Sequence, residues 1–119
     1  MSTPVGPYSP AMRAGPWLVT SGQIGVRPGP DGPALAEGGF AAQARQALKN
    51  VADILAGRGL AWANVVKVTV YLADMGDYAA LNEIYLSQIG DDRPARSVVG
   101  VDALPLGALV EVEVWAYAG

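Results

Sequence analysis

Hydrophobic residues recur with a helical period in two parts of this chain. Between Gly39 and about Gly57 they return every three or four positions, and Gly57 and Gly59 supply stop signals. The charged residues of this segment fall four apart on the other side, the pattern of a solvated face: Arg45, Lys49 and Asp53. A second helix is predicted after a capping residue, Asp74, and up to Gly90, with an apolar stripe of Tyr78, Leu81, Tyr85 and Ile89. The pattern therefore predicts two amphipathic helices.

Alternation of apolar and polar residues predicts the strands. It is found in four segments, residues 17–22, 65–72, 96–101 and 108–118. In the clearest one the core side would be formed by Val66, Val68, Val70 and Leu72. Four prolines and two glycines in residues 3–16 predict an extended arm. The turn-rich residues 27–33 predict a hairpin loop or a short excursion from the body.

The order of these elements predicts one domain over residues 1–119, an α+β sandwich with both helices on one face of a mixed sheet. The last strand suggests what happens on the other face. If its alternate residues from Val110 onward meet the helices, the opposite face presents Leu109, Glu111, Glu113, Trp115 and Tyr117. That face is too apolar to remain in water, so we expect the chain to associate with itself.

Composition narrows the chemistry, because the 119 residues include no His and no Cys. Thiol nucleophiles, Ser-His triads, disulfides and zinc sites with the usual nitrogen and sulfur ligands are therefore excluded. The formal net charge of −3 argues against a nucleic-acid binder, which needs a basic face. No apolar run approaches the roughly 20 residues of a membrane-spanning helix, and the first residues lack a leader pattern. We expect a cytoplasmic protein that uses simple acid/base chemistry.

Arg96 and Glu111 are the main candidates, because they lie on adjacent extended segments. The backbone before Arg96 is restricted by Pro94, and a guanidinium is a fixed fork for a carboxylate. Alternatively, Arg96 pairs at the surface with Asp91 or Asp92, a role that suits Arg93 better. Glu111 or Glu113 becomes a base with a raised pKa if its face is covered. Otherwise both are solvated or paired with Lys67 or an arginine.

Four further residues have a structural and a functional interpretation. Tyr8 either closes a pocket or anchors the arm to the body. Ser21 and Gly22 end a strand with a small residue, which allows a ligand to approach the backbone or forms a bulge. Asn82 is a cap, a surface residue or a polar pocket contact. The glycine spacing around Gly22 does not form a dinucleotide fingerprint or a phosphate loop.

Short motifs along nearly the whole chain, in this order, resemble the Rid family of reactive intermediate deaminases, also called the YjgF family or L-PSP endoribonucleases. They are Gly-Pro-Tyr-Ser at 6–9, Thr-Ser-Gly-Gln-Ile at 20–24, the helical segment 43–50, Val-Val-Lys-Val-Thr-Val at 65–70, Asn-Glu-Ile-Tyr at 82–85, Pro-Ala-Arg-Ser at 94–97 and the segment 104–111 from Leu-Pro to Glu. The resemblance implies a chorismate-mutase-like sandwich that forms a homotrimer, in which the sheets make a barrel with clefts between subunits.

The resemblance also implies an activity, the hydrolysis of 2-imino acids or their enamines to 2-oxo acids and ammonia without a cofactor or metal. Arg96 would bind the substrate carboxylate, and Glu111 would activate the attacking water. Backbone groups near Val98 and Gly22 would hold the nitrogen end of the substrate. Tyr8 would shape the cleft wall, and Ser21 and Asn82 would add polar contacts.

One departure from the family pattern concerns Val98, where deaminases commonly carry Cys. Pro10 and the proline-rich segment 28–33 also differ and would reshape the cleft, so the preferred substrate stays open. Three alternatives to a housekeeping deaminase remain. They are a trimeric protein that binds metabolites without turnover, an enzyme of a specialised pathway that acts on a larger imine, and a ribonuclease. The acidic charge and the missing His oppose the ribonuclease.

Overall fold

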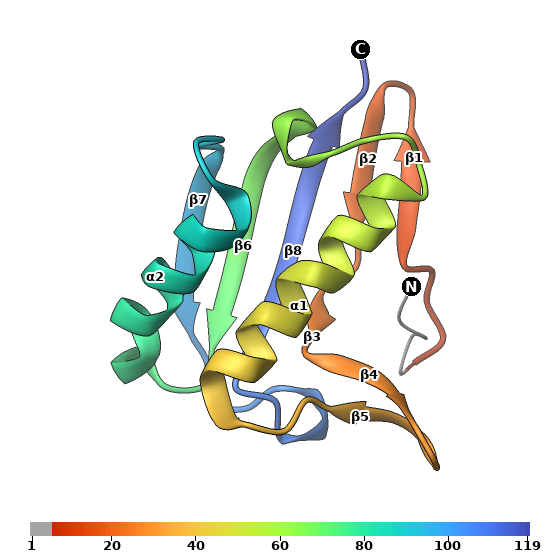
Figure 1. Ribbon diagram of the computed structural model, residues 1–119. Coiled ribbons are helices and arrows are strands. Elements are labelled where there is room, and N and C mark those ends of the chain that lie inside the picture. The colour runs from red at the N-terminus through yellow and green to blue at the C-terminus, as the bar shows by residue number, and fades with distance from the viewer. Residues whose placement is uncertain (1–5) are drawn as a thin grey trace.

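The computed structural model describes residues 6–119 as a sheet covered on one face by two helices (Figure 1). The helices are α1 (Gly39–Ala56) and α2 (Tyr78–Ile89). The main sheet consists of β1 (Ala11–Ala14), β2 (Trp17–Thr20), β3 (Gln23–Ile24), β6 (Val65–Leu72), β7 (Ala95–Gly100) and β8 (Val110–Tyr117). A separate two-stranded sheet is formed by β4 (Val26–Gly29) and β5 (Gly32–Leu35). Short 3₁₀ turns occupy Trp62–Asn64, Met75–Asp77 and Pro105–Gly107.

The strands of the main sheet follow the order β1-β2-β8-β6-β7, and β3 pairs with one end of β8. β6 and β7 run parallel, and α2 connects them, whereas the other pairs are antiparallel. Parallel neighbours require such a crossover, since a hairpin can join only antiparallel strands. The predicted α+β architecture with a mixed sheet and both helices on one face is therefore confirmed.

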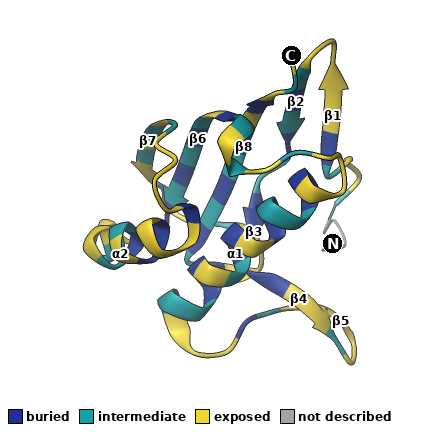
Figure 2. Ribbon diagram, turned by 45° about the horizontal axis from the view of Figure 1, so that its top comes forward, coloured by how far each residue is buried: buried dark blue, intermediate teal, exposed yellow. Residues whose placement is uncertain are grey.

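The core lies between the sheet and the helices, where Figure 2 shows the buried residues. Every second residue of β8 is fully enclosed there, from Val110 to Ala116. The residues between them point the other way, and Trp115 on that face is 48% exposed. On α2 the predicted apolar stripe is buried at Leu81, Tyr85 and Ile89. Its first member, Tyr78, is 41% exposed, because it begins the helix beside the 3₁₀ turn capped by Asp74.

One predicted detail of the strands is wrong. Val66 is 46% exposed and Val65 is buried in its place, because the register between β6 and β8 shifts at this point. Such a bulge changes which side chain faces the core, and alternation alone does not reveal it. The predicted extended arm ends in an edge strand, since residues 11–14 pair with β2. Residues 3–5 of that arm lie outside the described residues.

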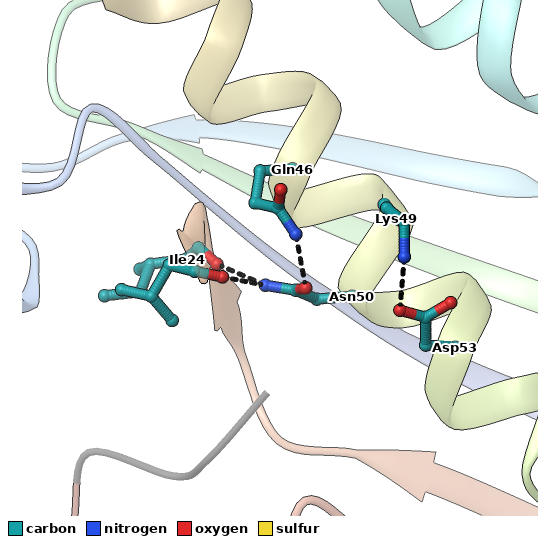
Figure 3. A network of polar contacts seen from close by, with 6 residues as sticks. Ile24, Gln46, Lys49, Asn50 and Asp53 are labelled. Carbon is teal, nitrogen blue, oxygen red and sulfur yellow. Dashed lines mark hydrogen bonds and ion pairs between the residues drawn. The ribbon is translucent and has the colours of Figure 1, made fainter. Parts of the chain in front are cut away.

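The hairpin predicted around residues 27–33 is confirmed, and a buried asparagine joins it to α1. The side-chain amide of Asn50 donates to the Ile24 and Val26 carbonyls, at 3.1 and 2.9 Å, and accepts from Gln46 (Figure 3). About one turn before Gln46 on α1 lies Gln43, whose side-chain Oε1 accepts a hydrogen bond from the Leu109 N–H. These bonds fix both β3 and the start of β8, the two segments that carry the glutamate side of the site described next.

Among residues 6–119, no helix has the length and apolar character needed to cross a membrane.

Candidate active site

One cavity of about 390 Å³ lies against α2 and the start of β7. Its lining, here called the arginine half-site, consists of Asn82, Tyr85, Leu86, Arg93, Pro94 and Arg96. Two of these residues are cations and none is an acid. The cavity is therefore suited to an anion.

Arg96 is held from several sides by α2. Its Nη2 donates to the Asn82 Oδ1 at 2.7 Å and to the Tyr78 hydroxyl at 3.3 Å. The guanidinium carbon lies 4.7 Å from the centre of the Tyr85 ring, a cation–π contact. Arg96 forms no ion pair with any residue of the described part of the chain, where the pair Lys49–Asp53 is the only one. The guanidinium is thus oriented by neutral groups, and its charge is available to a ligand.

Tyr85 lies directly beneath this guanidinium. Burial raises the pKa of its hydroxyl, and the charges of Arg96 and Arg93 act in the opposite direction. Its hydroxyl oxygen is buried and has no hydrogen-bond partner within residues 6–119. Because a buried hydroxyl without a partner is costly, this side of the half-site favours a ligand or water that completes it.

A second, smaller cavity of about 290 Å³ lies at the other face of the sheet. It is lined by Tyr8, Ser21, Gly22, Pro105 and Glu111, here called the glutamate half-site. The segment at Ser21 and Gly22 links β2 to β3, and Ile24 of β3 is the register partner of Glu111. On the helix side, the Asn50 amide donates a hydrogen bond to the Ile24 carbonyl, so the bonds shown in Figure 3 also fix this loop.

Gly22 is the residue that allows the Glu111 carboxylate to occupy this position. A Cβ added to Gly22 would overlap the Glu111 carboxylate, so any larger residue would displace it. The neighbouring Ser21 uses its hydroxyl to hold the arm, because it donates to the Ser9 carbonyl at 2.5 Å. Its backbone N–H donates to the Pro10 carbonyl at 2.8 Å. The arm that carries Tyr8 is therefore fastened beside Glu111.

The electrostatics of the open sheet face favour a protonatable Glu111. Burial raises the pKa of its carboxyl, and the charge of Glu113 two residues along β8 raises it further. Glu113 accepts a hydrogen bond of 2.5 Å from the Tyr71 hydroxyl. That bond is also the main reason why the pKa of Tyr71 is raised. Lys67 does not neutralise either acid, since it donates to the Ser97 hydroxyl at 2.7 Å.

The two half-sites lie on opposite faces of the sheet within one chain. Arg96 is the register partner of the buried Val68 and points toward α2, as does Val98, which packs against the core. Glu111 is the register partner of Tyr71 on the face without helices. Moreover, β6 separates β7 from β8, so the two segments adjacent in the chain are not neighbours in the sheet. The two extended segments that are adjacent in the sequence are therefore separated in the sheet, and within one chain Arg96 and Glu111 do not line a common cavity.

The structure thus divides the sequence-predicted residues into two groups. Arg96, Asn82 and Val98 lie on the helix side, and Tyr8, Ser21, Gly22 and Glu111 lie around the second cavity. Surface ion pairs of Arg96 or Arg93 with Asp91 or Asp92 are absent from the described residues, so that interpretation is wrong for both arginines. Asn82 is not a cap, because it lies inside α2 and binds Arg96.

Sequence reasoning missed several contributors, among them Tyr85, Pro105 and Tyr71. Tyr85 was predicted only as a core residue, although it lies three positions after Asn82 and hence on the same helix face. Tyr71 alternates onto the open face with Lys67 and Thr69, but its bond to Glu113 depends on the pairing of β6 with β8. Within residues 6–119, no group of three or more acidic side chains is arranged to bind a metal ion.

Comparison with known proteins identifies the family. The family model described as Endoribonuclease L-PSP matches residues 1–118, so the chain belongs to this family, which is the YjgF/Rid family. A mouse protein named 2-iminobutanoate/2-iminopropanoate deaminase is 44% identical over 115 residues, which cover 97% of this chain and 84% of the mouse protein. A RutC family protein of Pyrococcus horikoshii is 43% identical over 114 residues, which cover 96% of this chain and 89% of the Pyrococcus protein.

A solved structure of RidA from the Antarctic bacterium Psychrobacter has the same fold. Its TM-score is 0.89 at 40% sequence identity, and the match covers 98% of this chain and 92% of that one. The resemblance to the Rid family expected from the sequence motifs is therefore confirmed.

Proposed function

We propose that this protein is an imine deaminase that hydrolyses 2-imino acids, and the enamines that tautomerise to them, to 2-oxo acids and ammonia. The observation that carries the proposal is an arginine, Arg96, oriented by Asn82 and Tyr85 but without an acidic partner in residues 6–119. Such a guanidinium suits the carboxylate of a small acid. The deaminase name of the 44% identical mouse protein supports the same reaction class.

The active cleft of this proposal lies between two copies of the chain in a homotrimer. One copy contributes its arginine half-site and the next copy contributes its glutamate half-site, because the two lie on opposite faces of each sheet. The exposed aromatic residues of the open face support such an assembly. Trp115 is 48% exposed, and Trp17 packs against it edge to face, with ring centres 6.1 Å apart.

In the proposed mechanism, Arg96 binds the substrate carboxylate and so places the imine carbon beside a water molecule held by Glu111. Glu111 accepts a proton from this water as the water oxygen bonds to the imine carbon and the carbon–nitrogen double bond opens, and Glu111 then donates that proton to the imine nitrogen. From the resulting carbinolamine, Glu111 takes the hydroxyl proton and passes it to the amino nitrogen as the carbon–nitrogen bond breaks, which yields the 2-oxo acid and ammonia and restores the Glu111 carboxylate. A carboxyl whose pKa is raised by burial, as that of Glu111 is, suits this exchange near neutral pH.

The role of Val98 follows from its position beside Arg96 on β7. Its side chain packs toward the core, so its contribution to the cleft would come through the backbone. The hydroxyl of Ser21 is engaged with the arm, and the proposed role of this residue is to hold Tyr8 at the cleft wall.

A coupled assay tests the reaction. A pyridoxal-phosphate dehydratase that releases 2-aminoacrylate or 2-aminocrotonate supplies the substrate, and ammonia release is followed with and without the protein. The substitutions Arg96→Ala and Glu111→Ala should each reduce the acceleration by about 100-fold or more. Arg58→Ala and Glu37→Ala remove the same charges at exposed positions away from both half-sites and should leave the rate unchanged. Full activity of folded Arg96→Ala and Glu111→Ala proteins would contradict the proposal.

A further inference from the structure

Arg93 lines the same cavity as Arg96, and this second guanidinium has no role in the mechanism above. It precedes Pro94, whose ring restricts the backbone between the two arginines. No hydrogen bond or ion pair connects Arg93 to Asp91 or Asp92 in the described part of the chain. Neither of those acids lines the cavity.

The charge of this cavity exceeds what a monocarboxylate needs. Two guanidinium groups contribute to its wall, together with the neutral Asn82 and the apolar Leu86 and Pro94. The charges of Arg96 and Arg93 both act on the buried Tyr85 hydroxyl, so both lie near the same point of the cavity. The whole chain nevertheless carries a formal charge of −3, which makes this local excess of positive charge a specific feature rather than a general one.

We propose that Arg93 selects substrates with a second acidic group, so that the cleft takes 2-imino dicarboxylates in preference to imines with neutral side chains. Arg96 binds the carboxylate next to the imine carbon, and Arg93 binds the carboxylate at the far end of the side chain. A cavity of about 390 Å³ accommodates a five-carbon acid, and Leu86 and Pro94 cover its methylene groups. Because Arg93 is exposed, its contact with the far carboxylate contributes only modestly to affinity. It therefore adds selectivity, while the carboxylate next to the imine carbon, which all 2-imino acids carry, is bound by Arg96.

The inference rests on the proposed function, and equilibrium binding of reaction products separates the two. The probes are 2-oxoglutarate and its 5-dimethylamide, an amide that keeps the carbon chain, has no N–H with which to close a ring on the ketone, and lacks the second charge. By calorimetry at physiological salt, the unaltered protein should bind 2-oxoglutarate about five- to tenfold more tightly than the amide. Arg93→Gln should abolish this preference and leave the affinity for the amide unchanged, whereas Arg96→Ala should weaken both ligands.

Arg58→Gln serves as the control, because it removes one exposed positive charge far from the cavity and should retain the preference. Equal affinities for the two probes in the unaltered protein, a preference that survives Arg93→Gln, or no binding of either probe would overturn the inference. Deamination is measured in parallel. Binding selectivity without turnover would contradict the proposed function alone, and turnover without selectivity would contradict the inference alone.

Discussion

Arg96 and Glu111 lie on opposite faces of one sheet, with β6 between the strands that carry them. Arg96 points toward α2, where Asn82 and Tyr85 hold it, and Glu111 lies against Gly22 on the face without helices. Under the proposed function, one substrate reaches both side chains only where two copies of the chain meet. Each cleft then takes its arginine half-site from one copy and its glutamate half-site from the neighbouring copy.

The contact of Gly22 with Glu111 leads to the first prediction. In Gly22→Ala the added Cβ displaces the Glu111 carboxylate, so the deamination rate should fall about 100-fold, the usual effect of a misplaced catalytic group. The measurement is the coupled ammonia assay on purified protein, together with the unfolding midpoint in urea.

Gly57→Ala is the matched control. Gly57 has right-handed helical backbone angles, and a Cβ there would meet its nearest atom at an ordinary 3.5 Å. Its stability should be equal or slightly higher, and its rate should be unchanged. If Gly22→Ala keeps the full rate, Glu111 does not need its present position for the reaction.

A second prediction concerns the buried clamp of Asn50. Removing its amide in Asn50→Ala leaves the Ile24 and Val26 carbonyls without their donor, and should lower the free energy of unfolding by about 2–3 kcal/mol. The control is Lys49, one residue before Asn50 on α1. Lys49→Ala breaks only the exposed ion pair with Asp53 and should lower the free energy of unfolding by less than about 0.5 kcal/mol. Urea titrations of both variants provide the comparison. Equal effects would mean that the Asn50 amide adds nothing to stability.

The third prediction is a pH dependence set by Glu113. Burial is the main cause of the raised pKa of Glu111, and the negative charge of Glu113 adds to it. Glu113→Gln removes that charge, so Glu111 should lose its proton at lower pH, and the acidic limb of the kcat/KM profile should move to lower pH. The other titratable groups near Glu111 are Tyr8 on the arm and Tyr71 on β6, and the raised pKa of Tyr71 keeps its hydroxyl neutral in this range.

The control for this experiment is Glu37→Gln, which removes an equal charge at an exposed position before α1. Its pH profile should coincide with that of the unaltered protein. A Glu113→Gln profile that stays in place, or moves to higher pH, would show that the neighbouring carboxylate does not control Glu111.

Periodicity predicted the elements well, because burial on one face directly determines a repeat of two or of 3.6 residues. The limits of α1 and β6, and the inward set of β8 from Val110 to Ala116, agree with the sequence pattern. The exchange of Val65 for Val66 was not predictable, since a bulge depends on the partner strand. The pairing of residues 11–14 was hidden by the surrounding prolines.

The sequence names candidate site residues one by one but does not show their arrangement. The sequence motifs identified Arg96 and Glu111, yet their separation depends on the sheet order, which places β6 between β7 and β8. The aromatic support of Arg96 by Tyr85 requires the packing of α2 on β7, a tertiary contact that helical spacing only suggests. Arg93 was interpreted as a surface residue because two acids precede it in the chain.

The most direct test of the shared cleft is complementation between two inactive variants. Arg96→Ala and Glu111→Ala chains are mixed in equal amounts, unfolded and refolded together, and the deamination rate of the mixture is measured. If each cleft combines Arg96 of one copy with Glu111 of the next, random assembly restores both side chains in some clefts, and the rate should reach about a quarter of the wild-type value. A mixture that stays as inactive as the two separate variants would contradict the account.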